Sequence, residues 1–139
     1  MHVESLKLNN FRNYTNLEFA LPQNVSVFWG ANAQGKTNLL ESLCFLATTR
    51  FSHTIPDREI INWDALKEKI PFAQLSADIQ KKEGIKTQVE IIMRPRSLVP
   101  YEAAGTILHK HIRVNGVHRR AVDLMGQLNT CLLYTSDAA

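Results

Sequence analysis

The chain has 139 residues, of which 45% are hydrophobic and 21% charged, and its formal net charge is +3. This length suits one domain or part of a larger one, and the apolar share is enough to build a core. No stretch reaches the roughly 20 apolar residues of a membrane-spanning helix, no basic start precedes a long apolar run, and Cys44 and Cys131 lack a metal-ligand spacing. We therefore expect a cytoplasmic protein without a membrane segment.

Two β-strands are expected at the beginning of the chain. Residues 3–8 alternate between polar and apolar side chains, and residues 17–21 place an apolar side chain at every second position. Asn9-Asn10 is expected to end the first strand. Each strand is therefore predicted to bury one face.

The stretch that follows carries the most specific motif in the chain. Residues 30–37, Gly-Ala-Asn-Ala-Gln-Gly-Lys-Thr, fit the pattern G-x-x-x-x-G-K-[ST] of a phosphate-binding loop. β-Branched and aromatic residues at 25–29 predict a buried strand before this loop, and the apolar run after it predicts a helix from Lys36 to about Thr49. A strand, a glycine loop and a helix, in this order, are the context that the motif requires.

Each residue type in the loop has a chemical reason. Gly30 and Gly35 permit backbone angles that a Cβ atom would forbid, so successive N–H groups can converge on an anion at the start of the helix. Lys36 supplies a positive charge at the β- and γ-phosphates, and the Thr37 hydroxyl can ligate Mg²⁺. The expected cofactors are ATP and Mg²⁺, bound by Gly30, Ala31, Asn32, Ala33, Gln34, Gly35, Lys36, Thr37 and Asn38.

The helix after the loop is apolar almost all round, which predicts that it is buried between layers of sheet. Glu41 is its one interior charge, and we expect that side chain to be exposed. A short helix is expected over residues 57–62, with Asp57 as its N-cap.

The second half of the chain predicts two hairpins. Residues 72–79 and 85–93 alternate with a period of two on either side of a short polar turn, and residues 112–119 turn back at Asn115-Gly116. Residues 121–128 are expected to be helical. Because two strands precede the phosphate loop, the pattern favours an ABC-type ATPase head over a nucleotide kinase or small GTPase. We expect an α/β fold, the N-terminal lobe of such a head, with a mixed sheet and antiparallel hairpins around a buried P-loop helix.

The second hairpin carries the densest basic cluster in the chain, Lys110, His111, Arg113, His118, Arg119 and Arg120, of which Lys110, Arg113, Arg119 and Arg120 are the candidates for DNA contact. One interpretation is sequence-independent contact with the phosphates of DNA. The other is a solvated hairpin with charged outer faces, and both stay open. Aromatic side chains are not interleaved with these charges, which gives little support to stacking on single-stranded bases.

Five stretches share motifs with one known family. They are Phe11-Arg12-Asn13-Tyr14, residues 30–42, Ser52-His53-Thr54, Arg113-Val114-Asn115-Gly116 and Gly126-Gln127-Leu128-Asn129. These stretches closely resemble the amino-terminal part of the RecF family of bacterial recombination mediators, which is related to the ABC-type heads of structural-maintenance-of-chromosomes (SMC) proteins. Members of the family often carry Glu where Ala31 stands, and here Phe51 interrupts the usual Ser-His-Arg-Thr run.

The resemblance implies more than a phosphate loop. It implies an ATP-dependent DNA-binding protein of replication and recombinational repair, which binds single-stranded or gapped DNA and helps recombinase loading and the SOS response. It also implies a slow ATPase that forms an ATP-dependent homodimer when full-length, with RecO and RecR as partners. Arg12 and Asn13 match positions that in such heads can lie beside the nucleotide phosphates. A solvated turn residue is the alternative for Arg12.

Residues 131–139 do not resemble the family and instead resemble a translated transposase adapter from sequencing libraries. We therefore expect residues 1–130 to be the N-terminal part of the head and residues 131–139 to be a non-native tail. No hydrophobic run ending in paired acids follows the phosphate loop, so we expect no catalytic residues in this chain and little or no ATP turnover. The head of another SMC-like ATPase and a P-loop kinase of small molecules stay open as alternatives.

Overall fold

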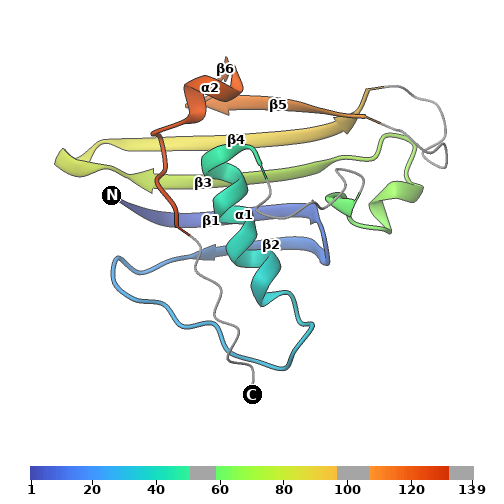
Figure 1. Cartoon of the computed structure of the whole chain (residues 1–139), viewed down its shortest axis with the longest axis horizontal. Coiled ribbons are helices and arrows are strands. Elements are labelled where there is room, and N and C mark those ends of the chain that lie inside the picture. Colours follow the sequence, from blue (N-terminus) through green and yellow to red (C-terminus); the bar gives the residue numbers. More distant parts are fainter. Residues whose placement is uncertain (51–58, 97–106, 132–139) are drawn as a thin grey trace.

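A computed structural model describes residues 1–50, 59–96 and 107–131, and within them six strands form one sheet (Figure 1). The strand order is β2-β1-β3-β4-β5-β6, and each neighbouring pair is antiparallel. The strands are β1 (His2–Phe11), β2 (Tyr14–Ala20), β3 (Ala73–Gln80), β4 (Lys86–Pro95), β5 (Leu108–Val114) and β6 (Val117–Arg119). The helices are α1 (Lys36–Thr48) and α2 (Ala121–Leu124), with 3-10 turns at Ala65–Lys67 and Lys82–Gly84.

The core lies between α1 and one face of the sheet, which we call the inner face (Figure 1). The hairpin predicted from residues 72–93 is confirmed as β3–β4, and its register places Leu75 opposite Ile91 and Ala77 opposite Val89. These side chains are buried, as are the apolar residues of β1 at positions 6 and 8. Alternate residues of each strand point to the other, outer face, because successive side chains in a strand point to opposite sides.

The hairpin predicted from residues 112–119 is confirmed as β5–β6. Its turn residues Asn115 and Gly116 have φ of 50° and 77°, the left-handed geometry that a two-residue hairpin turn needs. The Asn115 side chain also accepts a hydrogen bond from the backbone of Gln88 at 2.8 Å, which ties the turn to β4. The helix expected over residues 121–128 is shorter, because α2 ends at Leu124.

The expectation of a mixed sheet is wrong for the described residues, because the strand predicted at residues 25–29 does not form. That segment follows β2, an edge strand, and no described strand pairs with it. Its side chains are accordingly open to solvent, with Val25 87% and Trp29 88% exposed. High β-propensity alone cannot make a strand, since backbone pairing needs a neighbour.

Asn9-Asn10 does not end β1, contrary to the sequence expectation. Asn9 pairs with β2 on one side and β3 on the other, so the central position of β1 supplies backbone partners that override the local preference for a turn. The Asn10 carbonyl accepts a further hydrogen bond from the Asn62 backbone at 2.8 Å.

The helix predicted after the phosphate loop is confirmed as α1, but its surroundings differ from the expectation. Its sheet-facing residues, including Phe45 and Leu46, are fully buried, whereas Leu40 is 42% exposed. Within the described residues, only one sheet layer covers the helix. Glu41 was expected to be exposed and is buried, with 5% of its surface accessible.

Residues 60–62 are not helical, so that part of the helix expected over 57–62 is wrong, whereas Glu59 lies in a 3-10 turn. Ile60 and Ile61 are buried, and Ile61 forms a β-bridge with Phe11. Burial of these two side chains against the end of β1 holds the segment in an irregular path. Asp57, Phe51, the Ser52-His53-Thr54 motif and residues 132–139 lie outside the described residues. Among the described helices, none is long and apolar enough to cross a membrane.

A candidate nucleotide-binding site

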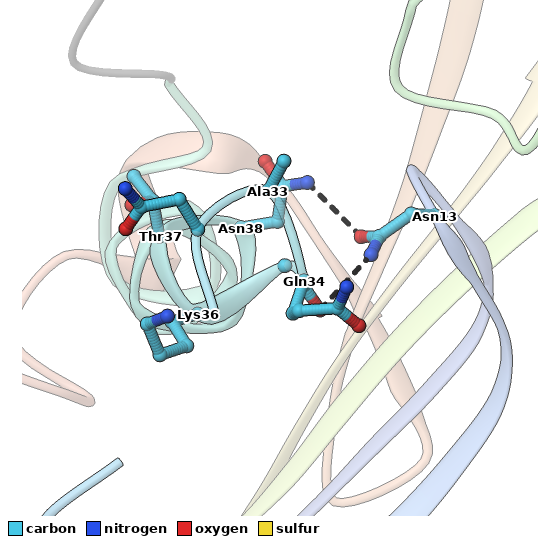
Figure 2. A pocket seen from close by; sticks show the side chains of 8 residues that line it. Asn13, Ala33, Gln34, Lys36, Thr37 and Asn38 are labelled. Atoms are coloured by element: carbon cyan, nitrogen blue, oxygen red, sulfur yellow. Dashed lines mark hydrogen bonds between the residues drawn. The ribbon is translucent and has the colours of Figure 1, made fainter. Parts of the chain in front are cut away.

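The phosphate loop leads into the first turn of α1 and lines a pocket of about 380 Å³ (Figure 2). Gly35 is the N-cap of α1, with φ 95° and ψ 9°, in the left-handed region that favours glycine. The first-turn N–H groups of an α-helix have no intrahelical partner, and Gly35 offers no side chain to cap them, so in α1 they point toward the pocket end of the helix. Such a helix end attracts anions.

Lys36 lies at the same pocket and folds back along its own loop. Its ammonium group donates hydrogen bonds of 2.6 Å to the carbonyls of Gly30 and Ala31. An ammonium has three N–H donors, so one remains for a phosphate oxygen without breaking either bond. The loop therefore holds its lysine in place before any ligand arrives.

The turn between β1 and β2 docks against the loop from the opposite side. Asn13 donates to the Gln34 carbonyl at 3.3 Å and accepts from the Asn38 side-chain amide at 3.0 Å (Figure 2). Arg12 donates to the Asn38 side-chain oxygen at 3.2 Å. Arg12 and Asn13, suggested by resemblance alone, are thus joined to the loop by a continuous set of hydrogen bonds.

Tyr14 fixes the same turn to the start of the helix. Its hydroxyl donates to the Gly35 carbonyl at 2.9 Å. Burial raises the pKa of the Tyr14 hydroxyl, so the group stays protonated and able to donate at neutral pH. The sequence analysis did not assign Tyr14 a role, although it stood in the recognised motif Phe11-Arg12-Asn13-Tyr14.

Gly35 is also required by close packing. A Cβ atom at this position would stand 2.8 Å from Asn13 Oδ1 and 3.0 Å from its Cγ, and closer still to its Nδ2. These separations are shorter than van der Waals contact, so any larger residue would push Asn13 away. The motif glycine serves both the left-handed backbone and the approach of the β1–β2 turn.

A second pocket, of about 320 Å³, adjoins the first, because Asn13 and Asn38 line both. Its other lining residues are Arg12, Glu59, Asn62, Trp63 and Asp64. Trp63 exposes 75% of its surface there, and the Asn62 amide donates to the Arg12 carbonyl at 2.8 Å. The sequence analysis missed this segment because its approach to the β1–β2 turn spans some fifty positions of chain, which no local pattern reveals.

Asn32, Ala33, Gln34 and Thr37 also line the first pocket, whereas Gly30 and Ala31 contribute carbonyls to Lys36. Nucleotide binding by these residues stays a prediction. Thr37 is exposed at the pocket, and its role in binding Mg²⁺ stays a prediction. Among the described residues, no group of three His, Cys, Asp or Glu side chains could hold a metal ion.

The four basic residues of the second hairpin do not form one surface. Lys110 points to the inner face, where its ammonium donates to the Thr49 carbonyl at 3.2 Å and lies 5.3 Å from the centre of the Phe45 ring. Arg113 points to the outer face and pairs with Glu90 at 3.5 Å. Arg119 and Arg120 are exposed, and Arg120 is paired with Asp123.

Comparison with known proteins gives a consistent result. The model of a family described as AAA domain matches residues 5–119. The chain is 38% identical over 142 residues to the DNA replication and repair protein RecF of Chloroflexus aurantiacus, and 40% identical over 140 residues to that of Herpetosiphon aurantiacus. Both matches cover 99% of this chain, but they cover only 35% and 36% of the length of the two relatives.

Among solved structures, the recombination mediator protein RecF with ATP, of the RecFOR pathway, matches with a TM-score of 0.72. This match covers 92% of the chain and 31% of the solved protein at 20% sequence identity, so it supports the fold. The chain is therefore RecF-like and spans about a third of the relatives that it matches, while the expectation of a non-native tail at residues 131–139 stays a prediction.

Proposed function

The chain belongs to the AAA domain family, and from this premise we propose that it is the nucleotide-binding part of an ATP-dependent DNA-binding protein of the RecF type. The observation that carries the proposal is the phosphate loop at the start of α1, with Lys36 held at its pocket. The RecF-like sequence favours this function over the head of another SMC-like ATPase and over a small-molecule kinase.

The loop fits a triphosphate for reasons of charge and shape. The unpaired first-turn N–H groups and the third donor of Lys36 supply hydrogen bonds to phosphate oxygens, and none of the residues that line the first pocket is acidic. Thr37 would hold Mg²⁺ through its hydroxyl, and the ion would neutralise charge on the β- and γ-phosphates.

The second pocket suits the nucleoside. It shares Asn13 and Asn38 with the first pocket, so one ligand can extend from one to the other. The exposed indole of Trp63 offers a stacking surface for a base, and Asp64 offers a carboxylate to ribose hydroxyls or an exocyclic amine. We assign the base to this side of the site.

The same geometry favours binding over hydrolysis. Activation of an attacking water needs a general base, and no Asp or Glu is among the described residues that line the first pocket. We propose that this chain by itself turns ATP over slowly or not at all, and that residues elsewhere in the full-length protein supply the base.

Nucleotide binding can be tested with a fluorescent ATP analogue and the variant Lys36→Ala. Loss of the charge-assisted hydrogen bond from Lys36 to phosphate should weaken binding at least tenfold, a difference of about 1.4 kcal/mol. Lys82→Ala, in the exposed turn between β3 and β4, is the matched control and should bind like the parent chain. Equal affinity of the parent chain and Lys36→Ala would contradict the proposal.

For DNA binding, we propose that Arg113, Arg119 and Arg120, which are exposed where β5 and β6 form the edge of the sheet, contact backbone phosphates of single-stranded or gapped DNA. Arg113 points to the outer face and Arg119, opposite Ile112, to the inner face, so the DNA would wrap around this edge. Lys110 is occupied on the inner face. Replacing Arg113 and Arg119 by Ala should reduce the salt dependence of binding by about two phosphate contacts, nearly equally for all sequences. An unchanged salt slope would remove this surface from the proposal. An ATP-dependent homodimer, RecO and RecR as partners, and roles in recombinase loading and the SOS response are proposed for the full-length protein by resemblance alone.

A further inference from the structure

Three histidines gather on the outer face of β5 and β6, away from the nucleotide pockets. His109 and His111 are two residues apart in β5 and so point to the same side of the sheet. His118 of β6 lies opposite Arg113 in the register, which places it on that side as well. The proposed function uses none of these imidazoles.

The rings of His109 and His111 are close, and each ring turns one nitrogen atom toward the other. His109 Nδ1 and His111 Nε2 are 3.1 Å apart, and the ring centres are 4.5 Å apart. The His118 ring is farther away, with its centre 6.4 Å from that of His111. In the absence of a ligand, the short distance requires one ring to donate an N–H to the other.

The same separation suits two ligands of one metal ion. With metal–nitrogen bonds of about 2.0–2.1 Å, two ligand nitrogens are about 3.3 Å apart when the ion is tetrahedral. They are about 2.9 Å apart when the N–metal–N angle is about 90°, as in square-planar or octahedral coordination. The observed 3.1 Å lies between these values. Small rotations of the two rings can therefore replace the shared proton by a metal ion.

Arg113 follows His111 by two residues in β5 and so lies on the same outer face as the two imidazoles. The charge of Arg113 is partly compensated by Glu90, 3.5 Å away, which lessens its repulsion of an incoming cation.

We propose that His109 and His111 bind one divalent transition-metal ion, such as Cu²⁺, Ni²⁺ or Zn²⁺, with water in the remaining coordination positions. Among the described residues, no group of three His, Cys, Asp or Glu side chains could hold a metal ion, so His109 and His111 are the two protein ligands that we propose. Imidazole prefers these ions, whereas Mg²⁺ prefers oxygen ligands, so this site is chemically distinct from a Mg²⁺ site at Thr37. The expected order of affinity places Cu²⁺ above Ni²⁺ and Zn²⁺.

The test is calorimetric titration of the untagged chain with Cu²⁺, Zn²⁺ and Mg²⁺. We expect one Cu²⁺ or Zn²⁺ per chain at this site, with no competition from Mg²⁺, and at least a tenfold loss of affinity in His109→Gln and in His111→Gln. His2→Gln, which removes an imidazole from β1, should bind metal within twofold of the parent chain.

A second measurement separates metal binding from folding. Because His109 is exposed, His109→Gln should keep the circular dichroism spectrum of the parent chain. A saturating metal ion should raise the melting temperature of the parent chain but not of His109→Gln, since binding to the native state alone stabilises it. Retention of parent affinity in the double variant His109→Gln/His111→Gln, or an equal loss in His2→Gln, would overturn the proposal.

Discussion

Substitution of Gly35 by Ala tests the central geometry of the nucleotide site. Two costs follow from the structure. An Ala residue in the left-handed region costs about 1–2 kcal/mol relative to its usual conformations, and Gly35 has φ 95°. The new Cβ would also overlap Asn13, which must give up its hydrogen bonds to Gln34 and Asn38, each worth about 1 kcal/mol.

The expected loss is therefore about 3–4 kcal/mol, concentrated in the loop that forms the phosphate cradle. If even about 2 kcal/mol of this appears as lost binding, the affinity for a fluorescent ATP analogue falls roughly thirtyfold. Gly84→Ala is the matched control, because Gly84 has φ 78° but nothing within 4 Å of its added Cβ. That variant should lose stability through strain alone and bind nucleotide like the parent chain.

The steric part can be separated by a double-mutant cycle with Asn13→Ala. Removing the Asn13 side chain relieves the overlap but leaves the backbone strain at Gly35. The loss of binding free energy in the double variant should therefore be smaller than the sum of the losses in the two single variants. Binding by Gly35→Ala within twofold of the parent chain would refute this account of the cradle.

Three further predictions concern single side chains. Tyr14→Phe removes the hydrogen bond to the Gly35 carbonyl and should lower the free energy of unfolding by about 1 kcal/mol, measured by urea denaturation. Because burial raises the Tyr14 pKa, the parent chain should lose stability as the pH rises above the ordinary tyrosine pKa of about 10. Tyr14→Phe should lose less stability over the same pH interval. Equal losses of stability in the two proteins would count against burial as the cause. Lys110→Met removes the contacts with the Thr49 carbonyl and the Phe45 ring and should cost about 1–2 kcal/mol of stability, while the affinity for DNA, measured by anisotropy, stays within twofold. A stable Lys110→Met variant with weakened DNA binding would place that lysine on the DNA surface instead.

Local sequence determined much of the fold. The Asn115-Gly116 pair specified a hairpin because its residues accept the left-handed angles of a tight turn, and the structure has that turn. The alternation of β3 and β4 specified a buried face because period two places every second side chain on one side. The phosphate-loop pattern specified the start of α1, since its glycine and lysine act through backbone geometry within a few residues.

Other features required contacts between distant parts of the chain. The β1–β2 turn reaches the phosphate loop because Asn13 and Asn38 are joined across 25 positions, and no local pattern encodes that distance. Burial of Glu41 depends on what packs around α1, which helix periodicity could not show.

Sequence by itself determined which residues belong to the phosphate loop, the two predicted hairpins and the alternating faces of their strands. Only the tertiary structure decided that Lys110 contacts the Thr49 carbonyl and the Phe45 ring, and that residues 25–29 form no strand. The physical reason is that turns and side-chain alternation arise between near neighbours in the chain. Strand pairing and the choice of the buried face depend instead on partners that only the folded chain brings together.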